Sequence, residues 1–405
     1  MRLALALLLF MCAASAAPED VVLRWQRENH SPTQLPENFP AAAIAAVEYW
    51  APFCARHGYR MDLEDGARVL LITPADNKAR GRQMRLIDRV VQLLEDEFPV
   101  PAGRGAAPAA KQTQPGSAPA TGGIPEDPEE GDHPWKIHGE DGVEIAATPT
   151  TWGADDIPLD HDPVVFVIPR DERAYGALLA HLGTAHGHVE AWSEVARRDQ
   201  GFVLPWPLTG AYMERPPGVE EWSPNHELVN RLARLLFLRR YGLQPYWAEL
   251  GIAWHFEVEL LDGIYVFPYR NEFVWAVEHD AWPADLQSRF NQRKQGPLRA
   301  EEFCGWRRGN YEPTAARLSF GFMDYLARKR DPDLPELFEA FRLLREENGI
   351  RKTGEYSWER NRDYQIPVAE QEALLREHLG DDVFEEAAEF FRAGAGKPLA
   401  KKKRH

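Results

Sequence analysis

The sequence predicts an α+β fold, with a small mixed sheet and its helices in the N-terminal part and a mostly helical C-terminal part. Two observations lead to this prediction. Short apolar runs alternate with amphipathic helical segments in the first half, and apolar residues recur mainly at helical spacing after Ser223. The chain has 405 residues, of which 44% are hydrophobic and 11% aromatic. This composition is sufficient for a sizeable core.

Two strand–helix units are predicted in the N-terminal part, after a helix within the first 60 residues. In the first unit, an apolar strand over 67–73 precedes a helix over 77–98 whose apolar residues recur every three or four positions. In the second unit, a strand over 163–168 precedes a helix over 172–182. The stretch 201–213 is predicted to be a strand at the edge of the same sheet.

The first residues predict export. Arg2 precedes an apolar run over 3–11 that is too short to cross a bilayer, and Ala14-Ser15-Ala16 has the small residues that signal peptidase recognises. Residues 1–16 are therefore expected to be a signal peptide, and the mature protein to be periplasmic or secreted. No later apolar run has the length of a membrane span.

The rest of the chain is expected to form one domain with an insertion. Residues 17–98 and 134–395 are predicted to share a core, because the second strand–helix unit follows the interruption. The interruption, 99–133, is rich in Pro, Gly and Ala and has few apolar residues to offset its ordering entropy, so it is expected to be disordered. Residues 396–405 form a basic tail that is expected to be solvated.

Charge and cysteine content restrict the partners and the chemistry. The formal net charge of −16 argues against nucleic acid or an anionic membrane as the main partner. Removal of the signal peptide would leave two cysteines, Cys54 and Cys304. An exported protein can join them in a disulfide, and two buried free thiols are the alternative.

The helical part is predicted to begin with a well-delimited helix over 224–241. Ser223 is a suitable N-cap, and Gly242 follows the last turn. Near its start the helix carries His226-Glu227-Leu228-Val229-Asn230. A zinc peptidase uses two histidines one helical turn apart, with a glutamate beside the first to accept a proton from metal-bound water. Here Asn230 stands in the place of the second histidine.

A second helix is predicted directly afterwards, beginning with Pro245-Tyr246-Trp247-Ala248-Glu249-Leu250-Gly251-Ile252-Ala253. The two helices resemble those of the gluzincin, or peptidase MA-like, zinc metallopeptidases of exported bacterial proteins. In that family the second helix carries Pro-x-Trp-Leu-x-Glu-Gly-Leu-Ala, and Trp247 and Gly251-Ile252-Ala253 match this pattern. The resemblance implies a mixed N-terminal part, a helical C-terminal part and a zinc ion bound by two histidines and a glutamate.

The ligand set that the resemblance implies is incomplete. Asn230 replaces the second histidine, Leu250 stands where the ligand glutamate belongs, and Glu249 is rotated from that place by about 100° around the helix. His226 alone cannot hold zinc, because protein zinc sites use at least three protein ligands. His226, Asn230 and Glu249 are therefore predicted to form a degenerate, empty metal site, with Glu227 as a catalytic base only in an active enzyme.

Three functions follow from these features. The favoured one is an inactive, metal-free protein that binds a peptide or protein ligand, for which the strand over 201–213 is one possible docking edge, although a plain sheet edge explains it better. The second is an active zinc metallopeptidase that uses His226, Glu249 and a further ligand. The third is a structural envelope protein whose 13 tryptophans serve packing alone. His255, on the second helix, is expected to be a surface or packing residue.

Overall fold

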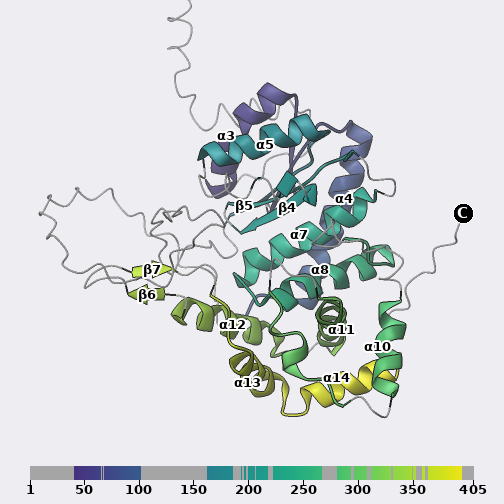
Figure 1. Ribbon diagram of the computed structural model, residues 1–405. Helices are drawn as coiled ribbons and strands as arrows, with labels where there is room; N and C mark the ends of the chain where they lie inside the picture. The colour runs from purple at the N-terminus through teal and green to yellow at the C-terminus, as the bar shows by residue number, and fades with distance from the viewer. Residues whose placement is uncertain are drawn as a thin grey trace, which may run out of the picture.

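The computed structural model describes residues 41–101, 162–185, 193–266 and 281–394, apart from positions 65, 67, 194–195, 198, 206, 218–221, 293–295, 308–311, 330–331, 349, 353–357 and 361–363. Within the described residues the fold is α+β, as the sequence predicts. A five-stranded mixed sheet lies between two layers of helices, and the chain after Trp222 is helical apart from one small hairpin (Figure 1).

The sheet has the strand order β1-β2-β3-β5-β4. The three central strands are parallel to one another, and each edge strand is antiparallel to its neighbour. In chain order the strands are β1 (Arg60–Leu63), β2 (Val69–Thr73), β3 (Val164–Val167), β4 (Gly201–Pro205) and β5 (Leu208–Tyr212). Their residues are almost entirely buried, as expected for a sheet that is covered on both faces.

The stretch 201–213 is a hairpin, which corrects the prediction of a single edge strand. The hairpin divides between Pro205 and Leu208, and Pro205 and Pro207 lack the backbone N–H that would continue a ladder. Of the two strands of this hairpin, β4 lies at an edge of the sheet and β5 pairs with β3 in its interior. Gly201 to Leu204 of the edge strand are buried.

In the part of the chain that the structure describes, two helices cover each face of the sheet. α3 (Ala41–His57) and α5 (Glu172–Ala185) lie on one face, and α4 (Asn77–Glu97) and α7 (Pro224–Tyr241) on the other (Figure 1). Successive residues of β2 point to opposite faces. Leu70 and Ile72 therefore pack with the first pair of helices, and Val69 and Leu71 with the second.

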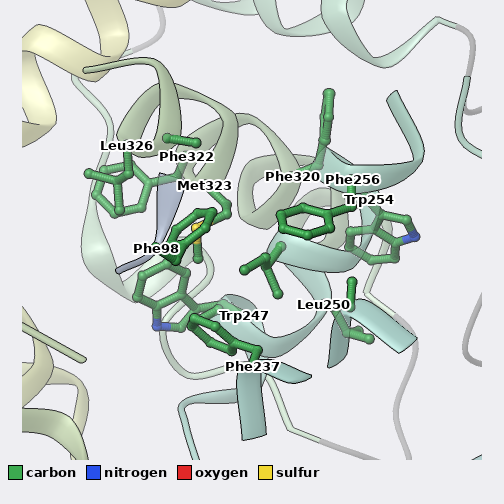
Figure 2. Close-up of a cluster of buried hydrophobic side chains, with 14 of the residues drawn as sticks. Phe98, Phe237, Trp247, Leu250, Trp254, Phe256, Phe320, Phe322, Met323 and Leu326 are labelled. Carbon is green, nitrogen blue, oxygen red and sulfur yellow. The ribbon is translucent and has the colours of Figure 1, made fainter. Parts of the chain in front are cut away.

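The C-terminal part packs its helices around α8 (Tyr246–Leu261), which is buried on all sides as far as Val258. The surrounding elements are α10 (Trp282–Asn291), a 3-10 turn η1 (Ala300–Glu302), α11 (Pro313–Lys329), α12 (Leu334–Asn348), α13 (Val368–Leu379) and α14 (Val383–Arg392), with a hairpin of β6 (Ile350–Lys352) and β7 (Trp358–Arg360). Figure 2 shows Trp247, Leu250 and Trp254 of α8 within an aromatic cluster that also takes side chains from α7, from α11 and from Phe98, which follows α4.

The ends of α7 agree with the sequence prediction, with one difference in detail. Gly242 ends the helix with a φ of 67°, a conformation that glycine adopts without strain. Ser223 occupies the N-cap position, but its side chain makes no capping hydrogen bond with any described residue. Proline at the first helical position, which has no backbone N–H to satisfy, accompanies this arrangement.

Cys54 and Cys304 are both buried free thiols in the structure. Cys54 belongs to the core between α3, α5 and the sheet, and Cys304 to the core of the helical part. Burial raises the pKa of the Cys54 thiol to about 12 and that of Cys304 well above its ordinary value, so both are protonated at neutral pH. The sequence left open a disulfide or two buried free thiols, and the structure has the free thiols.

Several predictions concern residues outside those that the structure describes. These are the signal peptide at 1–16, all but the first three residues of the insertion at 99–133, and the basic tail at 396–405. In the described part of the chain, no helix combines the length and the apolar character that crossing a membrane requires.

Gly251 allows α8 and α11 to approach closely, and its replacement by alanine should destabilise the protein. A Cβ at this position would lie 2.6 Å from the backbone oxygen of Ser319 and 2.8 Å from Cβ of Met323. We expect Gly251→Ala to lower the free energy of unfolding by about 1–3 kcal/mol in urea titrations. Gly176→Ala is the matched control, because a Cβ there meets nothing within 4 Å. It should raise stability by about 0.5–1 kcal/mol.

Candidate functional site

The candidate site lies between α7 and α8, at the level of the first two turns of α7. The two helices are antiparallel and joined by residues 242–245 alone. Asn230 lies eleven residues before the end of α7, and Glu257 lies eleven residues after the beginning of α8. The short connection therefore brings these two positions level with each other.

The carboxylate of Glu257 is the centre of the site. Its Oε2 lies 2.7 Å from Nδ1 of His226, and its Oε1 accepts a hydrogen bond of 2.6 Å from Nδ2 of Asn230. Oε2 also accepts the backbone N–H groups of Tyr265 at 2.8 Å and Val266 at 3.2 Å. Glu257 is completely buried, and these four contacts compensate for the hydration that its carboxylate loses.

His226 is the part of this cluster that reaches solvent. Its side chain keeps 15% of its accessible surface, whereas Glu257 keeps none. The imidazole ring packs against Tyr265, with 5.5 Å between ring centroids. Because Nδ1 faces the buried carboxylate, a hydrogen bond there fixes the orientation of the ring.

Glu227, the predicted catalytic base, is completely buried and paired with Arg231 one turn further along α7. The Oε2 atom of Glu227 lies 2.9 Å from one terminal nitrogen of Arg231 and accepts a 3.0 Å hydrogen bond from its Nε. Burial lowers the pKa of Arg231. The guanidinium also lies against β4, where a Cβ on Gly201 would come within 2.6 Å of it. Glycine at position 201 therefore leaves the room that this ion pair needs.

Glu249 does not join His226 and Asn230, which corrects the ligand grouping predicted from the sequence. Its Oε1 accepts hydrogen bonds of 2.6 Å and 3.0 Å from Arg234, one turn beyond Asn230 on α7. Leu250, at the expected third-ligand position, is 1% exposed and belongs to the apolar cluster (Figure 2).

The carboxylate that meets His226 and Asn230 is Glu257, which sequence reasoning missed. It lies seven residues after Leu250, on the same face of α8 two turns further on. The sequence prediction aligned Gly251-Ile252-Ala253 with the family pattern, and this local match put the third ligand at position 250. The pairing of side chains between antiparallel helices depends instead on the length of their connection. That length and the seven-residue spacing were the signals in the sequence that could have revealed Glu257.

The side chains at this site do not fit a zinc ion. Histidine and glutamate are ordinary zinc ligands, but the Asn230 amide is a poor one. Asn230 turns its amide nitrogen towards Glu257, and its buried Oδ1 has no hydrogen-bond partner among the described residues. The Glu257 carboxylate is engaged by four protein donors. The arrangement is that of a hydrogen-bonded cluster with an amide in one ligand place.

Comparisons with known proteins give no independent evidence on the function of this site. No family model matches the chain, and no curated protein was found that is similar to it. The resemblance of the two helices to gluzincins therefore stays a prediction from their sequence motifs.

A second polar cluster surrounds His255, which the sequence suggested was a surface or packing residue. His255 is completely buried, and its two ring nitrogens face carboxylates from two other helices. Nδ1 lies 2.9 Å from Oδ1 of Asp324 on α11, and Nε2 lies 2.8 Å from Oε2 of Glu97 on α4. The ring therefore joins three helices that are far apart in the sequence.

By distance alone, His255, Glu259 and Asp324 could hold a metal ion, because they offer ligand atoms within 4.8 Å of one another. Arg328 already bridges the two carboxylates, with its Nε 3.0 Å from Asp324 and a terminal nitrogen 2.6 Å from Glu259. Burial lowers the pKa of His255, but the hydrogen bonds to Asp324 and Glu97 outweigh it and raise the pKa to about 9. An imidazolium and a guanidinium thus offset much of the negative charge of the three carboxylates Glu97, Asp324 and Glu259.

The His255 cluster should make stability depend on pH in the alkaline range. The pKa of His255 is higher in the folded protein than its ordinary value of 6.5, so its contribution is complete below about pH 6.5 and is lost as the pH rises through about 9. We expect His255→Gln to lower the free energy of unfolding by on the order of 3 kcal/mol at pH 6.

Urea titrations of the wild type and His255→Gln at pH 6, 8 and 10 measure this effect. Glu97, Asp324, Glu259 and Arg328 are present in both proteins, so the two proteins differ only in the side chain at position 255. The difference should shrink by pH 10. A constant difference between pH 6 and pH 10 would mean that His255 is not held as an imidazolium.

Proposed function

We propose that this chain is an exported protein built on a gluzincin-like helix pair, that it has lost zinc and peptidase activity, and that it works by binding a peptide or protein ligand. The observation that carries the proposal is the buried ion pair between Glu227 and Arg231. It involves the side chain that a zinc peptidase needs as its base.

A general base must offer a lone pair to the water molecule or group that it deprotonates. Glu227 has no accessible surface. Its Oε2 lies 3.0 Å from Nε and 2.9 Å from a terminal nitrogen of Arg231. A buried carboxylate in such an ion pair is costly to separate from its partner, by about 3–5 kcal/mol when one member is removed. These contacts favour a structural role for Glu227 over proton transfer.

The metal side of the site supports the same proposal. Zinc needs at least three protein ligands, and the amide of Asn230 does not supply the third. An active enzyme that uses Glu249 as a substitute ligand has less support, because Glu249 pairs with Arg234. No cofactor is therefore part of the proposed function.

A purely structural role is the remaining candidate, and the tryptophans favour it in part. Trp50, Trp247, Trp254, Trp282 and Trp306 are buried in the two cores. Packing accounts for these five side chains without a ligand. Binding measurements are therefore needed to separate the two roles.

Metal content and hydrolysis test the loss of activity. After dialysis against excess zinc and removal of free metal, the wild type should hold far less than one zinc ion per chain by mass spectrometry, and His226→Ala should hold the same amount. Fluorescein-labelled casein should remain intact with or without a chelator. One zinc ion per chain that is lost in His226→Ala, together with chelator-sensitive cleavage, would show an active enzyme.

The binding half of the proposal needs its own measurement. Unstructured casein peptides labelled with fluorescein should raise their anisotropy on titration with the protein and should be recovered uncleaved. His226→Ala changes a partly exposed side chain of the Glu257 cluster, so it should weaken binding if the cluster contacts the ligand. Unchanged anisotropy at the highest soluble protein concentration would favour the structural role.

A further inference from the structure

We propose that this site lacks only one zinc ligand, at position 230, and that Glu257 keeps the place of the third ligand. This inference rests on the proposed metal-free function and identifies how the metal was lost. It differs from the sequence interpretation, in which both Asn230 and Leu250 were lost ligands.

The contacts of Glu257 support this assignment. His226 and Asn230 lie one turn apart on α7, so their side chains share a face. Both reach the same carboxylate, at 2.7 Å and 2.6 Å. Three side chains from two rigid helices therefore converge on one point.

The spacing is also close to that of a zinc site. Ligand atoms bound to zinc at 2.0–2.1 Å in a tetrahedron lie about 3.3 Å apart. The distances from the Glu257 carboxylate to His226 and to residue 230 would have to increase by less than about 1 Å. Small side-chain rotations can provide this change. Either ring nitrogen of histidine can bind a metal.

The surroundings of Glu257 match those of a metal ligand. The N–H groups of Tyr265 and Val266 fix the orientation of its carboxylate, as outer hydrogen bonds do for ligands in metal sites. The 15% exposure of His226 gives an ion access to the site from solvent. Leu250 offers no donor atom and lies two turns away in the apolar cluster.

The pairing of Glu227 with Arg231 is a second, separate change. The two side chains are joined by contacts of their own, although Arg231 lies near enough to Glu257 for that carboxylate to act on its charge. Restoring the missing ligand should therefore restore metal binding without peptide hydrolysis, because the carboxylate beside the first histidine stays paired.

The test uses the full mature chain with Asn230→His, and with Asn230→Asp as a second variant of the same size as asparagine. Calorimetric titration with zinc chloride should give one site per chain in Asn230→His, at least 100-fold tighter than any zinc binding by the wild type. Cobalt(II) should give the intense visible absorption of tetrahedral nitrogen and oxygen ligation. Zinc should raise the melting temperature of both variants but not that of the wild type.

Double variants show which residues hold the ion. Asn230→His with Glu257→Gln, and Asn230→His with His226→Ala, should each lose the site, whereas Asn230→His with Glu249→Gln should keep it. The inference is overturned if both single variants fold, by circular dichroism, and bind no more zinc than the wild type. It is also overturned if Glu257→Gln leaves the affinity of Asn230→His unchanged.

The failures of the two proposals are distinguishable. Stoichiometric zinc in the wild type, dependent on His226, contradicts the proposed metal-free function. A zinc-free wild type with zinc-free, folded Asn230→His and Asn230→Asp leaves that function standing and refutes only the assignment of Glu257.

Discussion

The burial of α7 is the constraint on which the rest of the structure depends. This helix lies between the sheet and α8, and it carries charged side chains into the core. An unpaired buried charge is costly, so each of these side chains needs a partner within the protein. The contacts supply them: Glu227 with Arg231, Arg234 with Glu249, Arg239 with the backbone oxygen of Asp162, and Arg240 with Glu95 and the backbone oxygen of Phe98. These pairs join α7 to α4, to α8 and to the residues before β3.

The same constraint explains the chemistry of the candidate site. A buried Glu257 without partners would be an uncompensated charge. The amide of Asn230, the imidazole of His226 and two backbone N–H groups hydrogen-bond to it instead. Asparagine at 230 is a poor metal ligand but a good hydrogen-bond donor. The residue that makes position 230 unsuitable for zinc thereby helps to stabilise the buried carboxylate of Glu257.

The clusters around His226 and His255 differ in burial, and this difference decides which of them a ligand could reach. His255 has carboxylates at both ring nitrogens and no contact with solvent, so its charge serves to hold α4, α8 and α11 together. His226 has one ring nitrogen on a buried carboxylate and keeps part of its surface exposed. A ligand can reach only the second of these two side chains, which is why the proposed binding function is placed at His226.

The sequence by itself determined the features that local chemistry controls. The helix from Pro224 to Tyr241 begins and ends where predicted, since proline, glycine and apolar spacing act within a few residues. The hairpin in 201–213, the free thiols of Cys54 and Cys304, and the role of Glu257 were decided by the tertiary structure. Each depends on which segments pack together, and that depends on sheet order and on the length of the connection between helices. Side chains distant in sequence become partners only through that packing, so matching a short motif does not identify them.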